Sequence, residues 1–378
     1  MTGLLPYGRQ SIDAADLAAV VAVLRSDWLT TGPAVARFEA DLAAWTGGNR
    51  AVSVTSGTAA LHVAYAAAEV GPGDQVITTP LTFVATASCA ALLGAEVVFA
   101  DVTEDTGNLD PAAVEPLLTD RTRVVAGVDY AGHPIDAEPL AALAHSRGAL
   151  LLEDAAHSIG SSWLGVPVGA LADVTTLSFF PTKNLTTAEG GAVVSADAEL
   201  LERARRFRTI GLVRDQDQLR YPDEGPWHQE VHAFGLNYRL PDLLCALGSS
   251  QLVRLGAFKA RRAQIHARYT AAFADVAEVR TPPCRTGADP AWHLFPLRVL
   301  DGSRRSLFEH LRASGIGVQV NYLPVYWHPV FEDLGYQRGL CPVAEEYYRR
   351  EISLPQFPDL TDDQVDRVID LVRGFFGA

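Results

Sequence analysis

One lysine stands in a setting that predicts chemistry rather than a surface charge. Lys183 is one of only two lysines in a chain rich in arginine, and it follows the apolar segment Ser178 to Pro181. An amine can lose its proton and condense with an aldehyde, whereas a guanidinium stays protonated. The other lysine, Lys259, stands beside Arg261 and Arg262 and is predicted to be a solvated charge on a polar helix face. Lys183 is therefore the candidate nucleophile.

A carboxylate closes an apolar run upstream of this lysine. The run Leu150 to Leu152 reads as a buried strand and leads directly into Glu153 and Asp154. Open α/β sheets bind ligands at the carboxyl ends of their strands, and an aspartate there suits the ring nitrogen of a pyridoxal cofactor. A cap on the following helix is the alternative role for Asp154. His157 fits either a cofactor contact or a core histidine with a satisfied hydrogen bond.

A third candidate is a turn from a strand into a helix at Ser56, Gly57 and Thr58. Unpaired backbone N–H groups at the start of a helix attract a phosphate, although a plain turn with a serine cap gives the same pattern. The turn is neither a Walker loop nor a G-x-G-x-x-G fingerprint. The absence of that fingerprint argues against an NAD-dependent sugar dehydratase or reductase.

The elements that must position these residues alternate along the first half of the chain. Apolar runs are separated by helical segments, a pattern that predicts βαβ units and a mainly parallel sheet of about seven strands, covered on both faces. The last two runs are close enough to be antiparallel neighbours. The predicted strands are residues 51–54, 75–78, 96–102, 123–130, 149–152, 175–180 and 192–195.

Other elements flank this sheet. Asp13 is predicted to cap a first helix, and Pro33 opens a second one that stops at Gly47. Residues 215–232 read as a long loop. We expect a large domain over residues 1–250 and a small α/β domain over 251–378. The remaining predicted elements are helices at 240–255, 257–273, 306–314, 342–350 and 361–375 and strands at 294–299 and 318–321.

Composition limits the class of protein. The 378 residues are 48% hydrophobic and 20% charged, with a formal charge of -14, which argues against nucleic acid or an anionic membrane as a partner. The four cysteines lie far apart without zinc spacing, so free thiols in a reducing cytoplasm and no metal site are expected. No secretory signal and no membrane span is visible, so we predict a soluble cytoplasmic protein.

Together these segments resemble the fold-type I pyridoxal-phosphate (PLP) enzymes, and more narrowly the DegT/DnrJ/EryC1/StrS family of sugar aminotransferases. The fold implied is a large, mainly parallel seven-stranded α/β domain with a smaller C-terminal one. The resemblance runs nearly from end to end. It is carried by seven segments in the family's order: Leu29 to Gly32, Thr55 to Thr58, Thr79 to Phe83, Glu153 to His157, Ser178 to Gly191, Gly235 to Leu240 and Trp292 to Phe295.

The resemblance also implies a role for each matched residue. Lys183 would form the internal aldimine with PLP, Asp154 would pair with the ring nitrogen, and Phe83 would stack on the ring. Residues implied to hold the phosphate are Gly57, Thr58 and Ser178, with His157 beside the ring. Asn237 would reach the cofactor of a neighbouring subunit, so a homodimer with shared active sites is expected. Tyr7, Thr31, Arg239 and Tyr322 would lie near the substrate.

The implied reaction is ping-pong amino transfer from L-glutamate to a nucleotide-linked keto sugar. Some family members carry histidine in place of the lysine and dehydrate instead, so Lys183 favours transamination. The segments Val128 to Gly132 and Thr186 to Gly191 look most like the 4-aminotransferases of UDP-linked 4-keto-6-deoxy-N-acetylhexosamines, the pseudaminic acid type. Alternatives are a 3-keto sugar or keto-cyclitol of antibiotic biosynthesis, and a non-catalytic PLP-binding regulator with the same fold.

Overall fold

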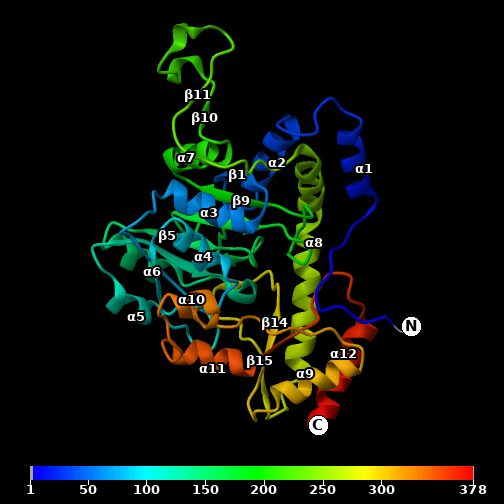
Figure 1. The fold of residues 1–378 in the computed structure, drawn as a ribbon. Coiled ribbons are helices and arrows are strands. Elements are labelled where there is room, and N and C mark those ends of the chain that lie inside the picture. The colour runs from blue at the N-terminus through cyan, green and yellow to red at the C-terminus, as the bar shows by residue number, and fades with distance from the viewer. Residues whose placement is uncertain (1–2, 378) are drawn as a thin grey trace.

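A seven-stranded sheet forms the centre of the protein in a computed structural model that describes residues 3–377 (Figure 1). Its strand order is β1-β9-β8-β5-β4-β2-β3. Strand β9 runs antiparallel to β1 and β8, as predicted for neighbouring β8 and β9, and the other pairs are parallel. The strands are Arg50–Val54 (β1), Gln75–Thr78 (β2), Glu96–Phe99 (β3), Thr122–Val128 (β4), Leu150–Asp154 (β5), Val174–Ser178 (β8) and Gly191–Ser195 (β9).

Helices cover both faces of this sheet because alternate strand residues enter different cores. Val124 and Ala126 of β4 pack in one core with residues of α3, α4 and α7, while Val125 between them packs in another with α6. This arrangement confirms the predicted fold class. The helices are Gly57–Ala67 (α3), Ala85–Leu92 (α4), Pro111–Val114 (α5), Ala137–His145 (α6) and Ala198–Arg208 (α7).

Several strands end earlier than the sequence predicts. β3 stops at Phe99 rather than at residue 102, and Val102 instead forms a bridge with Leu109. β4 ends at Val128 and β8 at Ser178, two residues before the predicted ends. β5 instead runs two residues further than predicted, to Asp154, so Asp154 and Ser178 end neighbouring parallel strands at one edge of the sheet, where they can face a ligand.

Three helices pack together beside the sheet. Asp13 caps α1 as predicted, through a capping box with Asp16. The prediction of two helices after residue 240 is wrong, because a single 31-residue helix passes through Gly256. Buried side chains on both sides of this glycine, including Leu255 and Phe258, hold the helix together. These helices are Ala14–Leu24 (α1), Pro33–Ala43 (α2) and Asp242–Ala272 (α8).

A second sheet of three antiparallel strands lies in the C-terminal part, in the order β12-β14-β15. The sequence missed β15, and the strand predicted at 318–321 is wrong, because that segment makes only a bridge between Gln319 and Ser353. The elements are Val279–Arg280 (β12), Phe295–Val299 (β14), Glu351–Leu354 (β15), Arg304–Ala313 (α9), Pro329–Asp333 (α10), Pro342–Arg350 (α11) and Asp362–Phe376 (α12).

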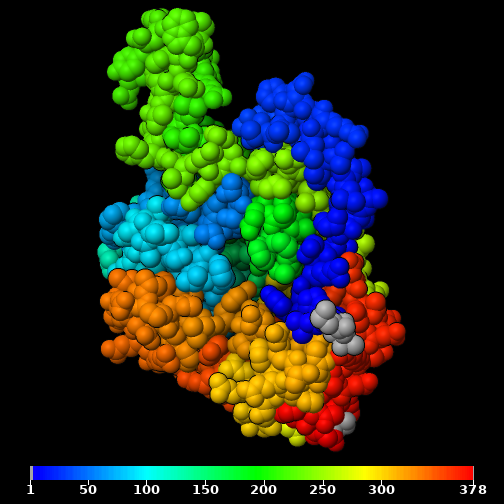
Figure 2. Space-filling model, turned by 45° about the vertical axis from the view of Figure 1, so that its right-hand side comes forward, coloured from blue at the N-terminus to red at the C-terminus, as the bar shows by residue number. Residues whose placement is uncertain are grey.

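The two sheets are joined by contacts far apart in sequence. Tyr326 and Phe331 pack against Phe99 in the core of the large sheet. Figure 2 shows the orange part of the C-terminal region lying against the cyan part of the large sheet domain. Helix α8 crosses residue 250, so the predicted boundary falls inside a continuous helix. The division into residues 1–250 and 251–378 stays a prediction, and residues 1–2 and 378 lie outside the described residues.

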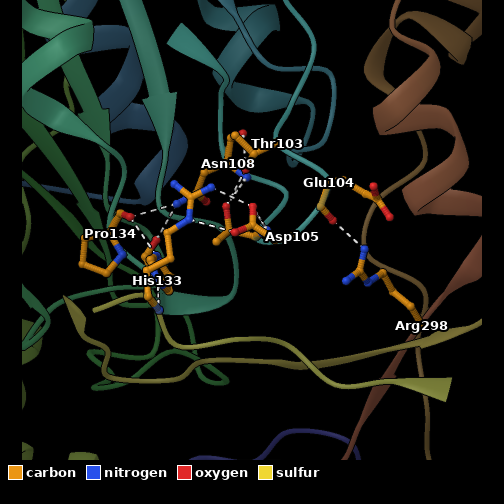
Figure 3. A network of polar contacts seen from close by, with 9 residues as sticks. Thr103, Glu104, Asp105, Asn108, His133, Pro134 and Arg298 are labelled. Carbon is orange, nitrogen blue, oxygen red and sulfur yellow. Dashed lines mark hydrogen bonds and ion pairs between the residues drawn. The ribbon is translucent and has the colours of Figure 1, made fainter. Parts of the chain in front are cut away.

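A polar network also ties the segment after β3 to the segment after β4 (Figure 3). Asn108 donates through Nδ2 to the carbonyls of His133 and Pro134, at 3.0 and 2.9 Å, and accepts from the backbone N–H of Tyr130. Arg298 of β14 donates to the carbonyl of Glu104, 2.5 Å away. The network fixes the carboxyl end of β4, which borders the site.

An arm, residues 210–237, projects from the rest of the molecule (Figures 1 and 2). The long loop predicted at 215–232 lies in it, joined by the short strands Leu212–Val213 (β10) and Glu230–Val231 (β11). Several large apolar side chains on the arm are exposed, among them Trp227 at 80% and Phe234 at 98%. Exposed apolar surface of this size is typical of an interaction surface.

The remaining elements are short. A small sheet has the order β13-β6-β7. Within residues 3–377 no helix is long and apolar enough to cross a membrane, and no group of three or more acidic, histidine or cysteine side chains could hold a metal. The short elements are Ser162–Trp163 (β6), Val166–Pro167 (β7), Ala288–Asp289 (β13) and 3-10 turns at 115–117, 130–132, 216–218, 222–224 and 325–327.

Candidate active site

A cavity of about 740 Å³ opens at the carboxyl edge of the large sheet. The ends of β4, β5 and β8, the start of α3 and the segment 319–323 all contribute to its wall. Nine residues selected from the sequence line it: Tyr7, Gly57, Thr58, Phe83, Asp154, His157, Ser178, Lys183 and Tyr322. These residues come from segments far apart in the chain, so the fold gathers most of the predicted site.

Lys183 lies in a tight turn just after β8. Its backbone N–H donates to the carbonyl of Phe180 at 2.9 Å, and the next residue, Asn184, is buried and donates to the carbonyl of His157. Burial lowers the pKa of the Lys183 ammonium to about 8, and the Asp154 carboxylate opposes that shift. About a tenth of the amine is therefore neutral at pH 7, far more than for a lysine with the ordinary pKa of 10.5, which suits a nucleophile.

Asp154 ends β5 and presents its carboxylate to the cavity. One oxygen accepts from the Thr86 hydroxyl at 2.7 Å, and the other accepts from the backbone N–H of Ala156 at 3.2 Å. Burial raises the pKa of Asp154, while these hydrogen bonds and the charge of Lys183 lower it. The alternative role as a helix cap is wrong, because no helix lies between β5 and Ser162, and the contact with Ala156 closes a turn.

The start of α3 and the end of β8 form a cradle on another wall. Ser56 caps α3 by accepting from the N–H of Ala59 at 3.0 Å. Gly57 approaches Ser178 so closely that an added Cβ would lie 2.7 Å from the Ser178 Cβ. Only glycine permits this approach, which brings the Ser178 hydroxyl beside the N-terminus of a helix. That combination of donors suits a phosphate.

Aromatic and imidazole rings line another part of the cavity wall. Nε2 of His157 lies 3.0 Å from the Tyr322 hydroxyl, and the His157 and His293 ring centroids are 4.4 Å apart. Burial lowers the pKa of both histidines well below the usual range, so both imidazoles are neutral. Phe83 is 58% exposed at the cavity. An exposed aromatic face beside a cavity is suited to stacking on a flat ring.

Three predicted residues stay outside this cavity. Thr31 lies exposed between α1 and α2, Asn237 is the last residue of the arm, and Arg239 follows the arm. Backbone bridges hold the last two in place, from Asn237 to Thr209 and from Arg239 to Val54. None of the three lines the cavity of the same chain. For Asn237 this position agrees with the expectation that it serves a neighbouring subunit, and the roles of Thr31 and Arg239 stay predictions.

The structure also adds residues that sequence analysis did not select. Thr86 is the hydroxyl donor to Asp154, yet a threonine inside an Ala-rich helix gives no signal of that role. His293 could have been found, because it belongs to the matched segment Trp292 to Phe295 and lines the cavity. Other lining residues are Thr182, Glu189, Gln319, Asn321 and His328.

A comparison with protein families decides the identity. The model of the DegT/DnrJ/EryC1/StrS aminotransferase family matches residues 10–373. The chain belongs to this family. The aminotransferase is 39% identical over 375 residues to the spore coat polysaccharide biosynthesis protein SpsC of Bacillus subtilis, covering 98% of this chain and 96% of SpsC. Its fold and its class, a PLP-dependent transaminase, are thus as the sequence predicted.

Solved structures agree with this assignment. The aminotransferase superposes on Helicobacter pylori PseC, an aminotransferase involved in the biosynthesis of pseudoaminic acid, with a TM-score of 0.92, 31% identity and 99% of each chain covered. Against DesV of S. venezuelae the TM-score is 0.90, with 34% identity and 100% of each chain covered. Spr1654 of Streptococcus pneumoniae, with structures in PLP and PMP forms, gives TM-scores of 0.92 and 0.93, at 28% and 29% identity and 99% of each chain covered.

The cavity of this aminotransferase fits the cofactor of its family. The cradle at Gly57 and Ser178 suits a phosphate, Asp154 suits a ring nitrogen, and the partly neutral amine of Lys183 suits an aldehyde. The unpartnered Nδ1 atoms of His157 and His293, as judged within residues 3–377, leave polar atoms in the wall for a ligand. The cavity of one chain therefore offers groups suited to the phosphate, the ring nitrogen and the aldehyde of PLP.

Proposed function

We propose that this aminotransferase moves an amino group from L-glutamate to the C4 ketone of a nucleotide-linked 4-keto-6-deoxy sugar, most like a UDP-linked N-acetylhexosamine. The observation that carries the proposal is the gathering of Lys183, Asp154 and the cradle around one cavity. The likeness to PseC over nearly the whole chain supports the sugar class. Lys183 and Asp154 in place favour an enzyme over a non-catalytic regulator.

The cavity residues predicted to bind the cofactor have the following proposed tasks. Gly57, Thr58 and Ser178 hold the phosphate, Phe83 covers one face of the ring, and His157 stands beside it. The Asp154 carboxylate keeps the ring nitrogen protonated. Bound PLP supplies an aldehyde and an electron-withdrawing ring that stabilises negative charge on the carbon next to the amine.

Lys183 is the proposed proton carrier. With PLP bound, the neutral Nζ of Lys183 would take the proton from the α-carbon of the amino donor and would return it on the other side of the transferred nitrogen. The pKa of about 8 that burial gives this amine matches the requirement, since an amine with its ordinary pKa of 10.5 is almost fully protonated near neutral pH. In the second half of the cycle the same atom moves the proton in reverse.

Tyr7 and Tyr322 are the proposed substrate contacts from the same chain. Both line the cavity, and the Tyr322 hydroxyl meets His157 at 3.0 Å. Thr31, Asn237 and Arg239 are proposed to serve the site of a second copy, with Asn237 reaching its phosphate. Their exposed or half-buried positions away from the cavity, together with the apolar arm, support a homodimer with shared sites.

The two lysines allow a matched test of the nucleophile. Borohydride should fix the cofactor on Lys183, and Lys183→Arg should lower amino transfer by about a thousandfold or more while the charge and fold remain. Lys259 is the control, since its Nζ is bound to the Gly160 carbonyl at 2.8 Å and to Asp289 at 2.6 Å. Label on Lys259, or an active Lys183→Arg enzyme, would contradict the assignment of Lys183 as the nucleophile.

A substrate panel tests the sugar. The pyridoxamine form is mixed with nucleotide-linked 4-keto and 3-keto sugars and with keto-cyclitols, and return of the aldehyde absorbance is followed. Fastest return with a UDP-linked 4-keto-6-deoxy sugar supports the proposal. Faster return with a 3-keto sugar or a cyclitol selects that alternative instead. The cytoplasmic location stays a prediction.

A further inference from the structure

Two carboxyl groups lie behind the cavity with no task in the proposed reaction. Asp129 follows the last residue of β4, and Glu153 is the penultimate residue of β5. The strands are parallel neighbours that place Val128 opposite Asp154, and the N–H of Asp129 donates to the carbonyl of Asp154 at 3.1 Å. Both side chains have no solvent exposure. A buried carboxyl group is costly unless it is hydrogen-bonded, so each oxygen of the two groups needs a partner.

Each carboxyl group accepts hydrogen bonds from one backbone N–H group and one hydroxyl group. The Asp129 oxygens accept from the N–H of Ile135 at 2.8 Å and from the Ser158 hydroxyl at 2.5 Å. One oxygen of Glu153, Oε2, accepts from the Gly169 N–H at 3.1 Å and the Thr175 hydroxyl at 2.8 Å. The other, Oε1, is buried and has no donor among residues 3–377.

The missing donor is the neighbouring carboxyl. Glu153 is the register partner of Gly127, so Asp129, two residues beyond Gly127, lies toward the same face of the sheet as Glu153, and the two carboxyl groups are close enough to shift each other's pKa. Two ionised carboxylates repel and cannot bond to each other, whereas one proton between them makes a strong bond and gives Oε1 a partner. The contact therefore requires a proton on one of the two groups.

The charged groups around the pair also favour a bound proton. Asp154 is the charged side chain that acts on both groups, and it repels a second negative charge. The surrounding elements contribute neutral donors only: Thr175 from β8, Ser158 from the segment after β5, and backbone N–H groups of Ile135 and Gly169. Burial raises the pKa of Asp129 well above its usual range and that of Glu153 to about 7.

We propose that Asp129 and Glu153 share one proton and act as a positioning pair behind Asp154. The pair carries a single negative charge, so Asp154 can remain the ionised carboxylate that faces the cavity. The consequence for the ring nitrogen rests on the proposed role of Asp154, but the shared proton does not. The pair holds the end of β5 and limits the negative charge behind it.

The shared proton predicts a pH dependence of stability. Folding raises the pKa of both groups, so each stabilises the native state below its ordinary pKa of 4.5 (Glu153) or 3.8 (Asp129). The contribution of Glu153 is lost as pH rises through about 7, and that of the proton kept by Asp129 is lost above that pH. Asp129→Asn should keep the hydrogen bond, because the amide donates to Glu153, and it removes the shared proton. Between about pH 5 and 7 the folding equilibrium constant of the wild type should fall by up to tenfold per pH unit relative to Asp129→Asn.

Urea unfolding of the full-length chain at several pH values measures this difference. Glu153→Gln is the reciprocal variant, since its amide can donate to Asp129, and it should remove the same slope. Other titrating groups contribute equally to all three proteins and cancel. Parallel curves for wild type and both variants would overturn the shared proton. If one variant fails to fold, the other still decides.

Infrared difference spectra report the proton directly. The wild type at about pH 8, where Glu153 has lost its proton and one proton remains on the pair, should show the C=O stretch of a protonated carboxyl that is lost in both Asp129→Asn and Glu153→Gln. A band unchanged by both variants would contradict the proposal. Neither measurement needs substrate or turnover, so a wrong sugar assignment cannot imitate a failure here.

The double variant Asp129→Asn with Glu153→Gln tests the electrostatic role. It removes the one remaining negative charge but keeps the shape and donors of the pair. Loss of a nearby negative charge favours deprotonation, so the pH at which the absorbance of the bound cofactor changes should move to lower pH. The two single variants keep the charge and should move it much less. If that pH is unchanged in the double variant, the pair has only a structural role and the proposed positioning function is refuted.

Discussion

At the scale of single residues, Gly57 leaves no space for a side chain opposite Ser178. Gly57→Ala would put its Cβ 2.7 Å from the Cβ and 2.8 Å from the Oγ of Ser178, so the cradle must open. Overpacking of this kind costs about 1–3 kcal/mol, which corresponds to roughly tenfold weaker cofactor binding or more. Cofactor titration of the apo protein checks this. Gly71→Ala is the control, because its Cβ would meet nothing within 4 Å.

Glu351 supplies a second prediction at this scale. It is fully buried and accepts from the Asn321 N–H at 2.6 Å and the Ser353 hydroxyl at 2.5 Å, next to Tyr322 of the cavity. Burial raises its pKa to about 8 from an ordinary 4.5. The raised pKa stabilises the fold below about pH 4.5, and this stability is lost as pH rises towards 8.

Glu351→Gln should therefore flatten the stability curve between about pH 5 and 8, since the amide can donate to Ser353 without a titrating proton. Urea unfolding at a series of pH values measures the change. The effect of this variant adds to that of the Asp129 variants, because the two sites titrate separately. A Glu351→Gln curve parallel to that of the wild type would contradict the raised pKa.

Much of the candidate site could be predicted from the sequence because its residues follow apolar strands. Asp154, Ser178 and Lys183 stand at or just after strand ends, and the carboxyl ends of neighbouring strands meet at one edge. Thr86 could not be found, because its role depends on a helix reaching across to β5. No sequence pattern indicates the role of Asp129 and Glu153 either, because only their burial and their closeness in the fold make them unusual.

At the scale of elements, helix α8 supports the lysine turn through Arg262. This arginine was expected on a polar face, yet it is 1% exposed and donates to the carbonyls of Trp292, His293 and Gln356 at 2.9–3.3 Å. Nη2 lies 3.5 Å from the carbonyl of Thr182, the residue before Lys183. One side chain thus joins the helix to three separate segments around the site.

Arg262→Met should destabilise the protein by roughly 3 kcal/mol or more, because it leaves several buried carbonyls without a donor. Arg268→Met on the same helix is the matched control. Arg268 pairs with Asp362 at 2.6 Å near the surface, so its loss should cost at most about 1 kcal/mol. Chemical denaturation compares the two, and equal losses would contradict a special role for Arg262.

The same helix shows where prediction of elements fails. A glycine at 256 suggested a break, but packing on both sides outweighs the roughly 1 kcal/mol that glycine costs in a helix. Strand β15 was missed because Glu351 opens it directly after α11, and a buried glutamate breaks the expected apolar pattern. Local patterns predict the large sheet well, since its strands are long apolar runs.

At the scale of the whole molecule, the shared-site dimer predicts complementation. Asn237→Ala should lose cofactor, and Lys183→Arg should lose amino transfer. In hybrid dimers one of the two sites regains both Lys183 and a partner Asn237. Equal mixing gives half hybrids with one intact site in two, so activity should recover to about a quarter of the wild-type value. No recovery, or unchanged cofactor retention in Asn237→Ala, would place Asn237 outside a shared site.

The contacts of the N-terminal segment have a consequence for biosynthesis. Leu5 bonds to the backbone of Gly315 and Gly317, and the carbonyl of Tyr7 accepts from the N–H of Gln356. Tyr7 reaches the cavity wall only when these late segments are in place. On the ribosome, the large sheet can therefore form early, but the pocket is completed only after residue 356 has left the exit tunnel. A nascent chain halted before that point should bind substrate poorly even with its central sheet folded.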